Sequence, residues 1–515
     1  VWSRATLALA YASALIRAEQ YAQAASLLDH PSITEDTQAA QWRQFITATL
    51  HYRTRRWPDL LAATAVSPPP EATYVLEPVS AAVAALTAAA SASLGQFQTA
   101  LDTADKIHTD NPYVSADVAL TRGWCLRELG DPDAALAAFR AAGGRIAETV
   151  PAATDLVIDG VVGISGSGAL RPNAAQVFAV VEQAGIPVVA VDLPSGLDVH
   201  TGAAEGAHVD AALTVTFGGL KPVHALGRCG RVELVDIGLD LPPSDVLGFE
   251  AADVAARWPI PGRADDKYSQ GVTGVMAGSS TYPGAAILCT GAAVAAHSGM
   301  VRYAGTAAGE VVSHWPEVIA TPSHATAGRV QAWAVGPGLG TDEAGASALC
   351  FALESDLPVI VDADGLTILS AHPELVADRE APTVLTPHAG EFARLAGSPP
   401  GDDRIADTRK LADRLGVTVL LKGNVTVIAE PGSGPVYLNV AGNSWAATAG
   451  SGDVLSGVIG ALLAGGLPPG EAAAAAAFVH SRAAEAAACD PGPAPVPTSS
   501  SQILAHLRTA LGSIL

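Results

Sequence analysis

The chain has 515 residues, of which 49% are hydrophobic and 16% charged, and its formal net charge at pH 7 is −22. One hydrophobic core rarely organises a chain of this length, so we expect roughly two to four domains. The acidic balance argues against nucleic-acid binding, because few cations remain to neutralise a phosphate backbone, but it leaves room for a local basic pocket around a small phosphorylated ligand.

The cysteines and the apolar runs bear on the cellular compartment. The five cysteines are widely spaced and none forms a Cys-x-x-Cys pair. This pattern argues against disulfides and structural zinc and fits a reducing cytosol. No uninterrupted apolar run is long enough to span a bilayer, and the first residues, VWSRATLALAYASALIRAEQ, lack the charged start of a signal peptide. We therefore predict a cytoplasmic protein that does not associate with membranes.

Residues 1–142 show only helical patterns. Apolar positions recur three and four residues apart, as in YAQAASLL and DAALAAFRAA. LGQFQTALDTA begins at Leu94 and LGDPDAALAAF at Leu129, which gives a period of 35 residues. Such a period, with glycine in the turn, predicts tetratricopeptide-like helix pairs, and a generic helical bundle is the alternative. The segment also resembles, more loosely, the N-terminal region of type VII secretion ATPases from actinobacteria, and we expect it to bind a protein partner.

From Gly143 the pattern changes to short strands that alternate with helices. DLVIDGVVG, IPVVAVDLPSG, ALTVTFGG and VELVDIG are typical of buried parallel strands, so residues 143–250 are predicted to form an α/β domain. The stretch RWPIPGRADDKYSQG marks the next boundary. Beyond it the alternation resumes, and residues 251–515 are predicted to form a second, doubly wound α/β domain.

Polar or glycine-rich turns follow successive strands of this second domain. They are GPGLG, DADG, TPHAGE and LKGN, and a further turn, AGSGD, precedes a long helix. The carboxyl ends of parallel strands meet at one edge of a sheet, so these turns should form one crevice. Glycines before a helix let backbone N–H groups converge on an anion, and Gly450–Asp453 is therefore predicted to bind phosphate.

Some of these turn residues have a structural alternative. His388 follows a proline at a strand end, where a lone histidine is more often a structural group, although its place within TPHAGE favours a function. Asp362 and Asp364 serve equally well as helix caps.

Residues 251–515 resemble the ribokinase-like carbohydrate kinases, and specifically their NAD(P)H-hydrate dehydratase branch. The resemblance rests on GSSTYPGAAILCTGAAVAAHSGM, VGPGLG, VLTPHAGEFARL, VLLKGNVTVIA and GNSWAATAGSGDVLSGVIGALLA. It implies nucleotide-dependent dehydration of (6S)-NAD(P)H hydrate, with ADP (or ATP) as phosphoryl donor and Asp453 as the base. The nucleotide-binding residues that it implies are Lys422, Gly423, Asn424, Val425, Thr426, Gly450, Ser451 and Gly452. Those implied to face the hydrated nicotinamide are Ala285, Gly338, His388 and Asp453.

The chemistry of the hydrate agrees with this site. Addition of water to the nicotinamide ring leaves a hydroxyl next to the ring nitrogen, and hydroxide is a poor leaving group. Phosphorylation converts the hydroxyl to phosphate, which the ring nitrogen can expel. Such a site needs a base, an anion hole and a cation, for which we expect Mg²⁺.

Residues 143–250 resemble the second half of the NAD(P)H-hydrate epimerase domain, on the basis of LVIDGVVGISGSGALR, VVAVDLPSGLDVHTG and TVTFGGLKP. The resemblance implies that Asp159 and Ser195 bind K⁺. The substrate contacts that it implies are Gly163, Ile164, Ser165, Gly166, Ser167, Gly168, Ala169 and Asp192. Helical-repeat sequence stands where the first half of the domain would be, so we expect a partial Rossmann-like sheet with an unpaired edge strand, weakened or lost epimerase activity, and self-association into a homo-oligomer.

Two other functions remain open at this point. A kinase of a small alcohol, such as a hydroxymethyl-pyrimidine or a thiazole alcohol, would use the same fold, but the epimerase-like segment disfavours it because that pairing suits hydrates. A helical-repeat interaction protein with inactive α/β domains is disfavoured by the presence of Asp453, Lys422 and His388.

Overall fold

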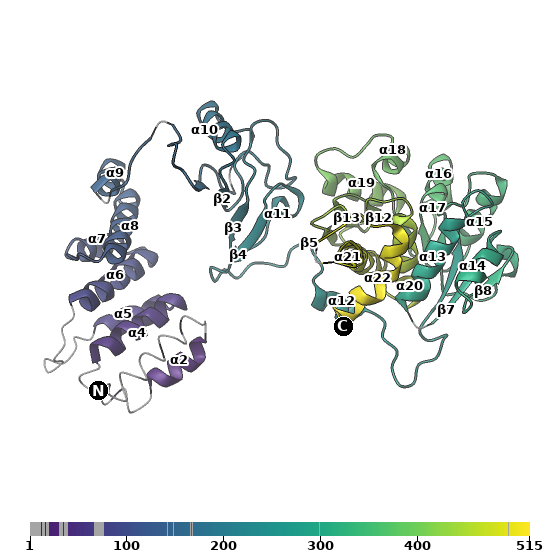
Figure 1. The fold of residues 1–515 in the computed structure, drawn as a ribbon, viewed down its shortest axis with the longest axis horizontal. Coiled ribbons are helices and arrows are strands. Elements are labelled where there is room, and N and C mark those ends of the chain that lie inside the picture. Colours follow the sequence, from purple (N-terminus) through teal and green to yellow (C-terminus); the bar gives the residue numbers. More distant parts are fainter. Residues whose placement is uncertain are drawn as a thin grey trace. The chain divides into compact units, whose positions relative to one another are not determined.

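The structure is a computed structural model of the chain. It describes residues 20–29, 40–65, 77–141 and 143–515, apart from positions 148, 165, 167, 298 and 493, and also the isolated residues 12, 16 and 34. The chain divides into two compact units, Val1–Thr149 and Val150–Leu515 (Figure 1). No helix among the described residues is long and apolar enough to cross a membrane.

The described part of the first unit consists of helices. The helices are α2 (Tyr21–Leu28), α4 (Ala40–Arg53), α5 (Trp57–Ala65), α6 (Glu77–Ser93), α7 (Phe97–Ala104), α8 (Pro112–Glu128) and α9 (Pro132–Ala141). Gly95 and Gly130 lie in the turns α6–α7 and α8–α9 with φ of +74° and +84°, a conformation that favours glycine. The predicted helical segment is therefore confirmed, and its assignment to tetratricopeptide repeats stays a prediction.

The second unit begins with a small parallel sheet. Its strands are β1 (Val157–Asp159), β2 (Val188–Val191), β3 (Leu213–Phe217) and β4 (Arg231–Val235), hydrogen-bonded in that order. Helix α10 (Pro172–Gln183) packs Phe178 and Val181 against Val188, and the short α11 (Pro222–Leu226) follows β3. Strand β1 has β2 as its only neighbour among the described residues, and its Ile158 side chain is 67% exposed. The predicted partial sheet with an open edge is thus observed.

A ten-stranded sheet forms the rest of this unit, in the order β5-β14-β13-β12-β11-β10-β9-β6-β7-β8. All neighbours are parallel except that β13 runs antiparallel to β12 and β14. The strands are β5 (Val246–Leu247), β6 (Val272–Met276), β7 (Met300–Ala304), β8 (Ile319–Thr321), β9 (Ala332–Val335), β10 (Val359–Val361), β11 (Thr383–Leu385), β12 (Thr418–Leu421), β13 (Val425–Ala429) and β14 (Val436–Val440).

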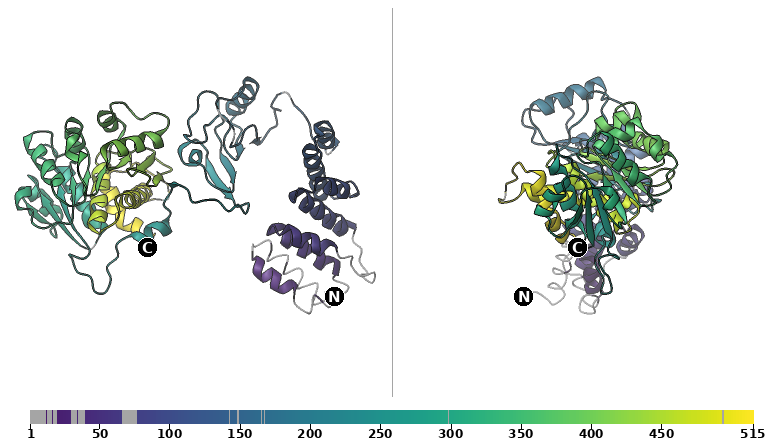
Figure 2. Two further views of the ribbon diagram at one scale, coloured as in Figure 1. Left: turned by 180° about the vertical axis from the view of Figure 1, so that it is seen from behind. Right: turned by 90° about the vertical axis from the view of Figure 1, so that its right-hand side faces the viewer.

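Helices cover both faces of this sheet (Figures 1 and 2). Consecutive strand residues point to opposite sides, so Ile360 joins one hydrophobic core while Val359 and Val361 join the other. One core includes α13 (Pro283–Ala296), α20 (Ser451–Ala464), α21 (Pro469–Ala488) and α22 (Ser500–Gly512), with α12 (Ala251–Arg257) and α14 (Ala308–His314) beside it. The other includes α15 (Glu343–Leu353), α16 (Asp364–Ala371), α17 (Glu374–Ala377), α18 (Ala389–Ala396) and α19 (Arg404–Leu415). This is the predicted doubly wound fold.

The order of the strands places a crevice at the carboxyl edge of the sheet. The chain first passes from β6 to β7 on one side and later returns to β9 on the other side of β6. The connections on the two sides of such a reversal leave in opposite directions, and a ligand crevice opens between them. The turns GPGLG, DADG, TPHAGE and LKGN follow β9, β10, β11 and β12 and therefore lie along this edge.

Close packing of small residues fixes α20 against α13. A Cβ atom added at Gly457 of α20 would clash with the carbonyl oxygen of Cys289 and lie 2.8 Å from the Cβ of Ala292. We expect Gly457→Ala to lower the free energy of unfolding by about 1–3 kcal/mol, because the two helices would have to separate. Urea denaturation of the purified protein measures this change.

Gly309 in α14 provides a matched control, because a Cβ atom there would meet nothing within 4 Å. We expect Gly309→Ala to be neutral or to stabilise by up to about 1 kcal/mol, since alanine restricts the unfolded chain. Equal losses of stability in the two variants would contradict the role assigned to the α13–α20 contact.

Candidate active site

The first turn of α20 presents free backbone donors. Gly450 caps the helix with φ of +83°. The N–H groups of Gly450, Gly452 and Asp453 have no hydrogen-bond acceptor within the described residues, whereas that of Ser451 donates to the carbonyl oxygen of Thr448 at 3.2 Å. The positive end of the helix dipole adds to these donors, so the turn can hold an anion.

Asp453 lies in this same turn and is half-buried. Burial, with a smaller contribution from the nearby negative charge of Asp362, raises the pKa of its carboxyl group to about 7, although the positive charge of Lys422 opposes the shift. A carboxyl group with a pKa near neutrality can accept a proton and release it again under physiological conditions. The residue expected as the base therefore has the electrostatic setting of one.

A buried ion pair lies beneath the turn. Nζ of Lys422, at the end of β12, is 2.5 Å from Oδ1 of Asp362, at the end of β10, and the Asp362 side chain is only 1% exposed. The other carboxylate oxygen of Asp362 accepts a hydrogen bond of 2.7 Å from the Ser456 hydroxyl of α20. A Cβ atom at Gly452 would lie 3.2 Å from Lys422 Nζ, so the ammonium group adjoins the anion-binding turn.

Neither aspartate of DADG caps a helix through its side chain. Ala363 occupies the N-cap position of α16 with φ of +50°. Asp362 bonds to Lys422 and Ser456 instead, and Oδ2 of Asp364 accepts the N–H of Gly340 at 2.9 Å. The capping alternative for these residues was therefore wrong, because tertiary partners outcompete the local ones.

Gly338 and Ala285, two of the residues expected to face the substrate, lie next to each other. Gly338 adopts φ of +58°, and a Cβ atom there would lie 2.7 Å from the Cβ of Ala285. Gly336 in the same turn has φ of +120°, and any side chain at this position would clash with the carbonyl oxygen of Asp362. The GPGLG turn therefore packs directly against both the start of α13 and the Asp362 segment.

His388 caps the helix that follows it. Its Nδ1 accepts the N–H of Gly390 at 2.9 Å, and its own N–H donates to Glu391 Oε2 at 2.9 Å, which completes a capping box. The ring is 58% exposed. The structural alternative for His388 is thus observed, and its hydrogen bonds do not join it to the Asp453 cluster.

The predicted nucleotide segment Lys422–Thr426 comprises the turn between β12 and β13 and the first two residues of β13. Gly423 and Asn424 are exposed, whereas the side chain of Val425 packs in a core, so Val425 offers only its backbone. Arg404 of α19, which the sequence did not indicate, lies against Gly423 and donates to the carbonyl oxygen of Lys422 at 3.3 Å. No ion pair joins Arg404 to a carboxylate in the described part of the chain, so its positive charge is available at this edge.

The predicted K⁺ ligands in the small sheet touch each other. The N–H and the hydroxyl of Ser195 donate to the two carboxylate oxygens of Asp159, both at 2.7 Å, and both side chains are fully buried. The hydroxyl oxygen of Ser195 also accepts the N–H of Val162 at 3.1 Å. The side-chain atoms that Asp159 and Ser195 could offer to a metal ion are all oxygens, which suits a hard cation. No group of three or more His, Cys, Asp or Glu residues placed to hold a metal ion occurs among the described residues.

Asp192 lies beside the predicted epimerase loop in an uncommon backbone conformation, with φ of +72°. Its carboxylate accepts hydrogen bonds from Lys221 Nζ at 2.6 Å, from the Thr216 hydroxyl at 3.0 Å and from the N–H of Ile164 at 3.1 Å. Burial alone would raise the pKa of Asp192, but these hydrogen bonds outweigh it and lower the pKa. Lys221 is the lysine of the segment TVTFGGLKP, and no role was predicted for it from the sequence.

The structure describes the other residues of the predicted epimerase loop, Gly163–Ala169, except Ser165 and Ser167. A Cβ atom at Gly163 would lie 3.6 Å from Asp192 Oδ2, and the N–H of Gly166 bonds to the carbonyl oxygen of Gly163. Gly168 has φ of +76°, and the Ala169 methyl lies against Gly206. Ser165 and Ser167 lie outside the described residues.

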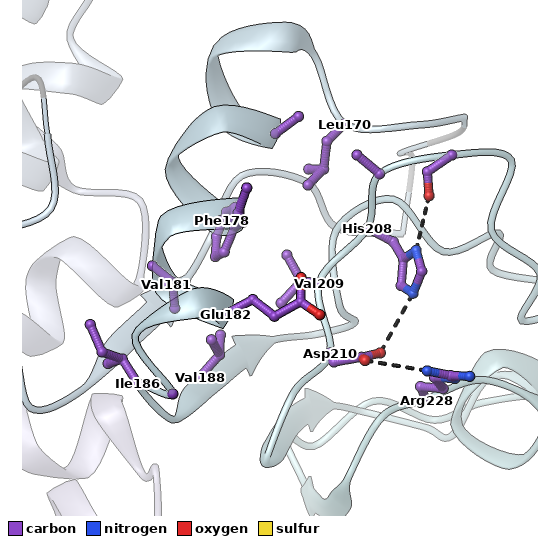
Figure 3. A pocket seen from close by; sticks show the side chains of 15 residues that line it. Leu170, Phe178, Val181, Glu182, Ile186, Val188, His208, Val209, Asp210 and Arg228 are labelled. Carbon is purple, nitrogen blue, oxygen red and sulfur yellow. Dashed lines mark hydrogen bonds and ion pairs between the residues drawn. The ribbon is translucent and has the colours of Figure 1, made fainter.

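A separate hollow of about 440 Å³ lies between α10 and the loop before β3 (Figure 3). Phe178 and Val209 line it, and Asp210 pairs with His208 and Arg228 at its rim. None of the predicted site residues lines this hollow, so it is distinct from the Asp192 site.

Comparisons with known proteins match this division of the chain. A model of NAD(P)H-hydrate dehydratases matches residues 273–506, and a model of the N-terminus of YjeF-related proteins matches residues 116–223. A model of the N-terminal domain of the ESX-1 secretion system protein EccA1 matches residues 1–156.

Curated relatives decide the family. The bifunctional NAD(P)H-hydrate repair enzyme Nnr of Mycobacterium leprae is 74% identical over 380 residues, which cover 74% of this chain and 80% of the relative. The enzyme of the same name from Mycobacterium tuberculosis strain H37Rv is 77% identical over the same shares. The chain belongs to the family of bifunctional NAD(P)H-hydrate repair enzymes.

A solved dehydratase structure is also similar to part of this chain. An ADP/ATP-dependent NAD(P)H-hydrate dehydratase from Bacillus subtilis, co-crystallised with ATP and Mg²⁺, is 28% identical and aligns over 52% of this chain and 99% of its own, with a TM-score of 0.46. Like the repair enzymes of its family, this chain carries a dehydratase segment and an epimerase-related segment.

The raised pKa of Asp453 makes a prediction about stability. In the unfolded chain the pKa of an aspartate is about 3.9, so between pH 4 and pH 7 the folded state binds more protons at Asp453 than the unfolded state. This contribution makes the folded state less stable as the pH rises through that window. We therefore expect Asp453→Asn to raise Tm relative to the unsubstituted protein more at pH 8 than at pH 5, as measured by thermal unfolding.

The exposed Asp378 supplies the control. Asp378→Asn should change Tm by the same small amount at both pH values, because its carboxylate faces water in the folded as well as in the unfolded chain. A Tm difference for Asp453→Asn that is independent of pH would contradict the electrostatic setting described above.

Proposed function

We propose that residues 251–515 catalyse the nucleotide-dependent dehydration of (6S)-NAD(P)H hydrate to NAD(P)H, with ADP or ATP as the phosphoryl donor. The observation that carries the proposal is the first turn of α20, where a carboxyl group with a pKa of about 7 adjoins three backbone donors that find no acceptor in the described part of the chain. Membership of the repair-enzyme family supports the choice of substrate.

The reaction follows from the positions of these groups. Asp453 removes the proton of the hydrate's hydroxyl as the hydroxyl oxygen attacks the terminal phosphoryl group. The bond between that phosphorus and its bridging oxygen breaks, which releases AMP from ADP or ADP from ATP. The N–H groups of Gly450 and Gly452 stabilise the charge on the phosphoryl oxygens, and Lys422 adds a positive charge beside them. The ring nitrogen then expels phosphate, and loss of a proton from the adjacent ring carbon forms the double bond that restores the reduced nicotinamide.

Nucleotide and cation binding are assigned to the same edge. We assign the phosphates to Lys422–Thr426 and Gly450–Gly452, with Arg404 as an additional cation. When bound, Mg²⁺ supplies positive charge against the phosphates. Asp364 fits it, because its Oδ1 has no hydrogen bond within the described residues and Mg²⁺ prefers carboxylate oxygens and water. Ala285, Gly338 and His388 are assigned to the hydrated ring.

Recovery of NADH from its hydrate tests the proposal. The mixed epimers of NADH hydrate, Mg²⁺ and the protein are combined with ADP, with ATP or with neither, and NADH absorbance is followed. We expect recovery only with nucleotide, and a fall of about 10²–10⁴-fold in rate for Asp453→Asn, the usual contribution of general base catalysis. Absence of nucleotide-dependent recovery by a folded protein would refute the dehydratase assignment.

The two roles of His388 can be separated by substitution. Asparagine is a good helix N-cap, so we expect His388→Asn to keep Tm within about 2 °C. The KM for the hydrate should rise several-fold, because the proposed contact between the imidazole and the hydrated nicotinamide ring is lost. Unfolding and steady-state kinetics on one preparation measure both effects. Unchanged KM together with unchanged Tm would leave His388 with its capping role alone.

For the epimerase-related segment we propose a site around Asp192, with K⁺ held by Asp159 and Ser195, in a sheet whose open edge at β1 weakens the activity. With mixed epimers we expect the S epimer to be recovered rapidly and the R epimer at the spontaneous rate of epimerisation. Complete rapid recovery that disappears in Asp192→Asn would show instead that the segment is active.

The wider setting is also proposed from the sequence and the family. We place the enzyme in the cytoplasm, treat residues 1–142, 143–250 and 251–515 as its domains, and expect a homo-oligomer whose N-terminal helices bind a protein partner. The open edge of β1 supports self-association, because its backbone groups have no neighbouring strand among the described residues.

A further inference from the structure

The last helix, α22, is hydrogen-bonded to the residue that precedes the anion-binding turn Gly450–Asp453. The hydroxyl of Ser500, in the first turn of α22, donates a hydrogen bond of 2.5 Å to the carbonyl oxygen of Ala449. Ser500 is only 4% exposed and is separated from Ala449 by 51 positions in sequence. It makes this bond instead of capping its own helix, whose N-cap residue Ser499 likewise makes no capping hydrogen bond.

This bond sets the direction of the next N–H group. In a planar trans peptide the C=O and N–H groups point in opposite directions. Because the carbonyl oxygen of Ala449 points to Ser500, the N–H of Gly450 points away from α22, and it has no acceptor within the described residues. The Ala449–Gly450 peptide is therefore oriented by a residue that does not itself belong to the turn.

Side chains of α13 and α22 pack closely against the backbone of Gly450. A Cβ atom at Gly450 would lie 2.7 Å from Leu288 Cδ1 and 3.4 Å from the Ser500 Cβ. Glycine also tolerates the backbone rotations that would turn this peptide over, so local sequence alone does not hold the N–H in place. A second side-chain hydrogen bond holds the next residue of the turn. His480 Nε2 of α21 lies 3.0 Å from the Ser451 hydroxyl, and both residues are buried.

We propose that Ser500 is a positioning residue of the anion hole, which orients the Ala449–Gly450 peptide so that the N–H of Gly450 is presented to the terminal phosphoryl group of the nucleotide. This inference rests on the proposed function for the identity of the anion. Ser500 acts through the peptide and makes no contact with the reacting atoms. The C-terminal helix thereby becomes part of the machinery for phosphoryl transfer.

Three variants of the full chain test the inference. Ser500→Ala removes the hydroxyl, Ser500→Thr retains one, and Ser499→Ala removes an adjacent hydroxyl that is exposed and bonds only to the Ser501 hydroxyl. For Ser500→Ala we expect kcat to fall about 10- to 100-fold, less than the ~10²–10³-fold typical for complete loss of an oxyanion donor, because the peptide is misoriented and not removed. The KM for the hydrate should stay unchanged, Ser500→Thr should recover most of the activity, and Ser499→Ala should match the unsubstituted protein.

Nucleotide binding supplies a readout that does not depend on dehydration. In calorimetric titrations Ser500→Ala should bind ADP more weakly while binding AMP as the unsubstituted protein does, because only the terminal phosphate needs the oriented N–H. A general loss of structure would weaken both. Failure of the unsubstituted protein to recover NADH while it still binds ADP would refute the proposed function alone.

Several results would overturn the positioning role. They are unchanged kcat and unchanged ADP affinity in Ser500→Ala, an equal loss in Ser499→Ala, and a loss of activity that follows a lowered Tm and is not restored in Ser500→Thr. An unsubstituted protein that binds neither ADP nor AMP would overturn both the inference and the proposed function.

Discussion

The ion pair between Asp362 and Lys422 is the interaction on which the rest of the site depends. A carboxylate that is 1% exposed is costly to bury unless a cation and a hydrogen-bond donor compensate it, and Lys422 and Ser456 supply these. The three residues come from β10, β12 and α20, so the pair joins two strand ends to the helix that carries the anion hole. It also places an ammonium group against Gly452, where a side chain would crowd it.

The same pair contributes to the proton affinity of Asp453, the proposed base. Burial and the charge of Asp362 raise the pKa of Asp453, and Lys422 opposes the shift, so the carboxyl group reaches about 7 and not a value at which it would stay protonated. Packing then makes the arrangement rigid, since α20 lies against α13 through Gly457 and most of its other residues are buried. Donors that are already oriented need no reorganisation when charge develops on the phosphoryl group, which is the main source of electrostatic catalysis.

The order of strands and turns could be predicted from the sequence because each is a local pattern. Val- and Ile-rich runs followed by polar turns indicated the doubly wound sheet, and the glycines at 450 and 452 indicated a turn before a helix, for which the anion hole stays a proposal. Side-chain partners could not be predicted in the same way. The Asp362 carboxylate meets a lysine 60 positions later, and Ser500 reaches back 51 positions to Ala449. Such contacts are made by the tertiary fold, and the periodicity of a segment carries no information about them.

The two aspartates assigned to chemistry show how one side chain is tuned in opposite directions. Asp453 is buried near a second carboxylate, and its pKa rises to about 7, which suits a group that must take up a proton. Asp192 is also partly buried, but Lys221, Thr216 and the N–H of Ile164 all donate to it, and its pKa falls. It therefore stays ionised at neutral pH and accepts a proton less readily. For Asp192 to act as a base in the proposed epimerase site, its proton affinity would have to rise, and weakening of the Lys221 hydrogen bond would raise it.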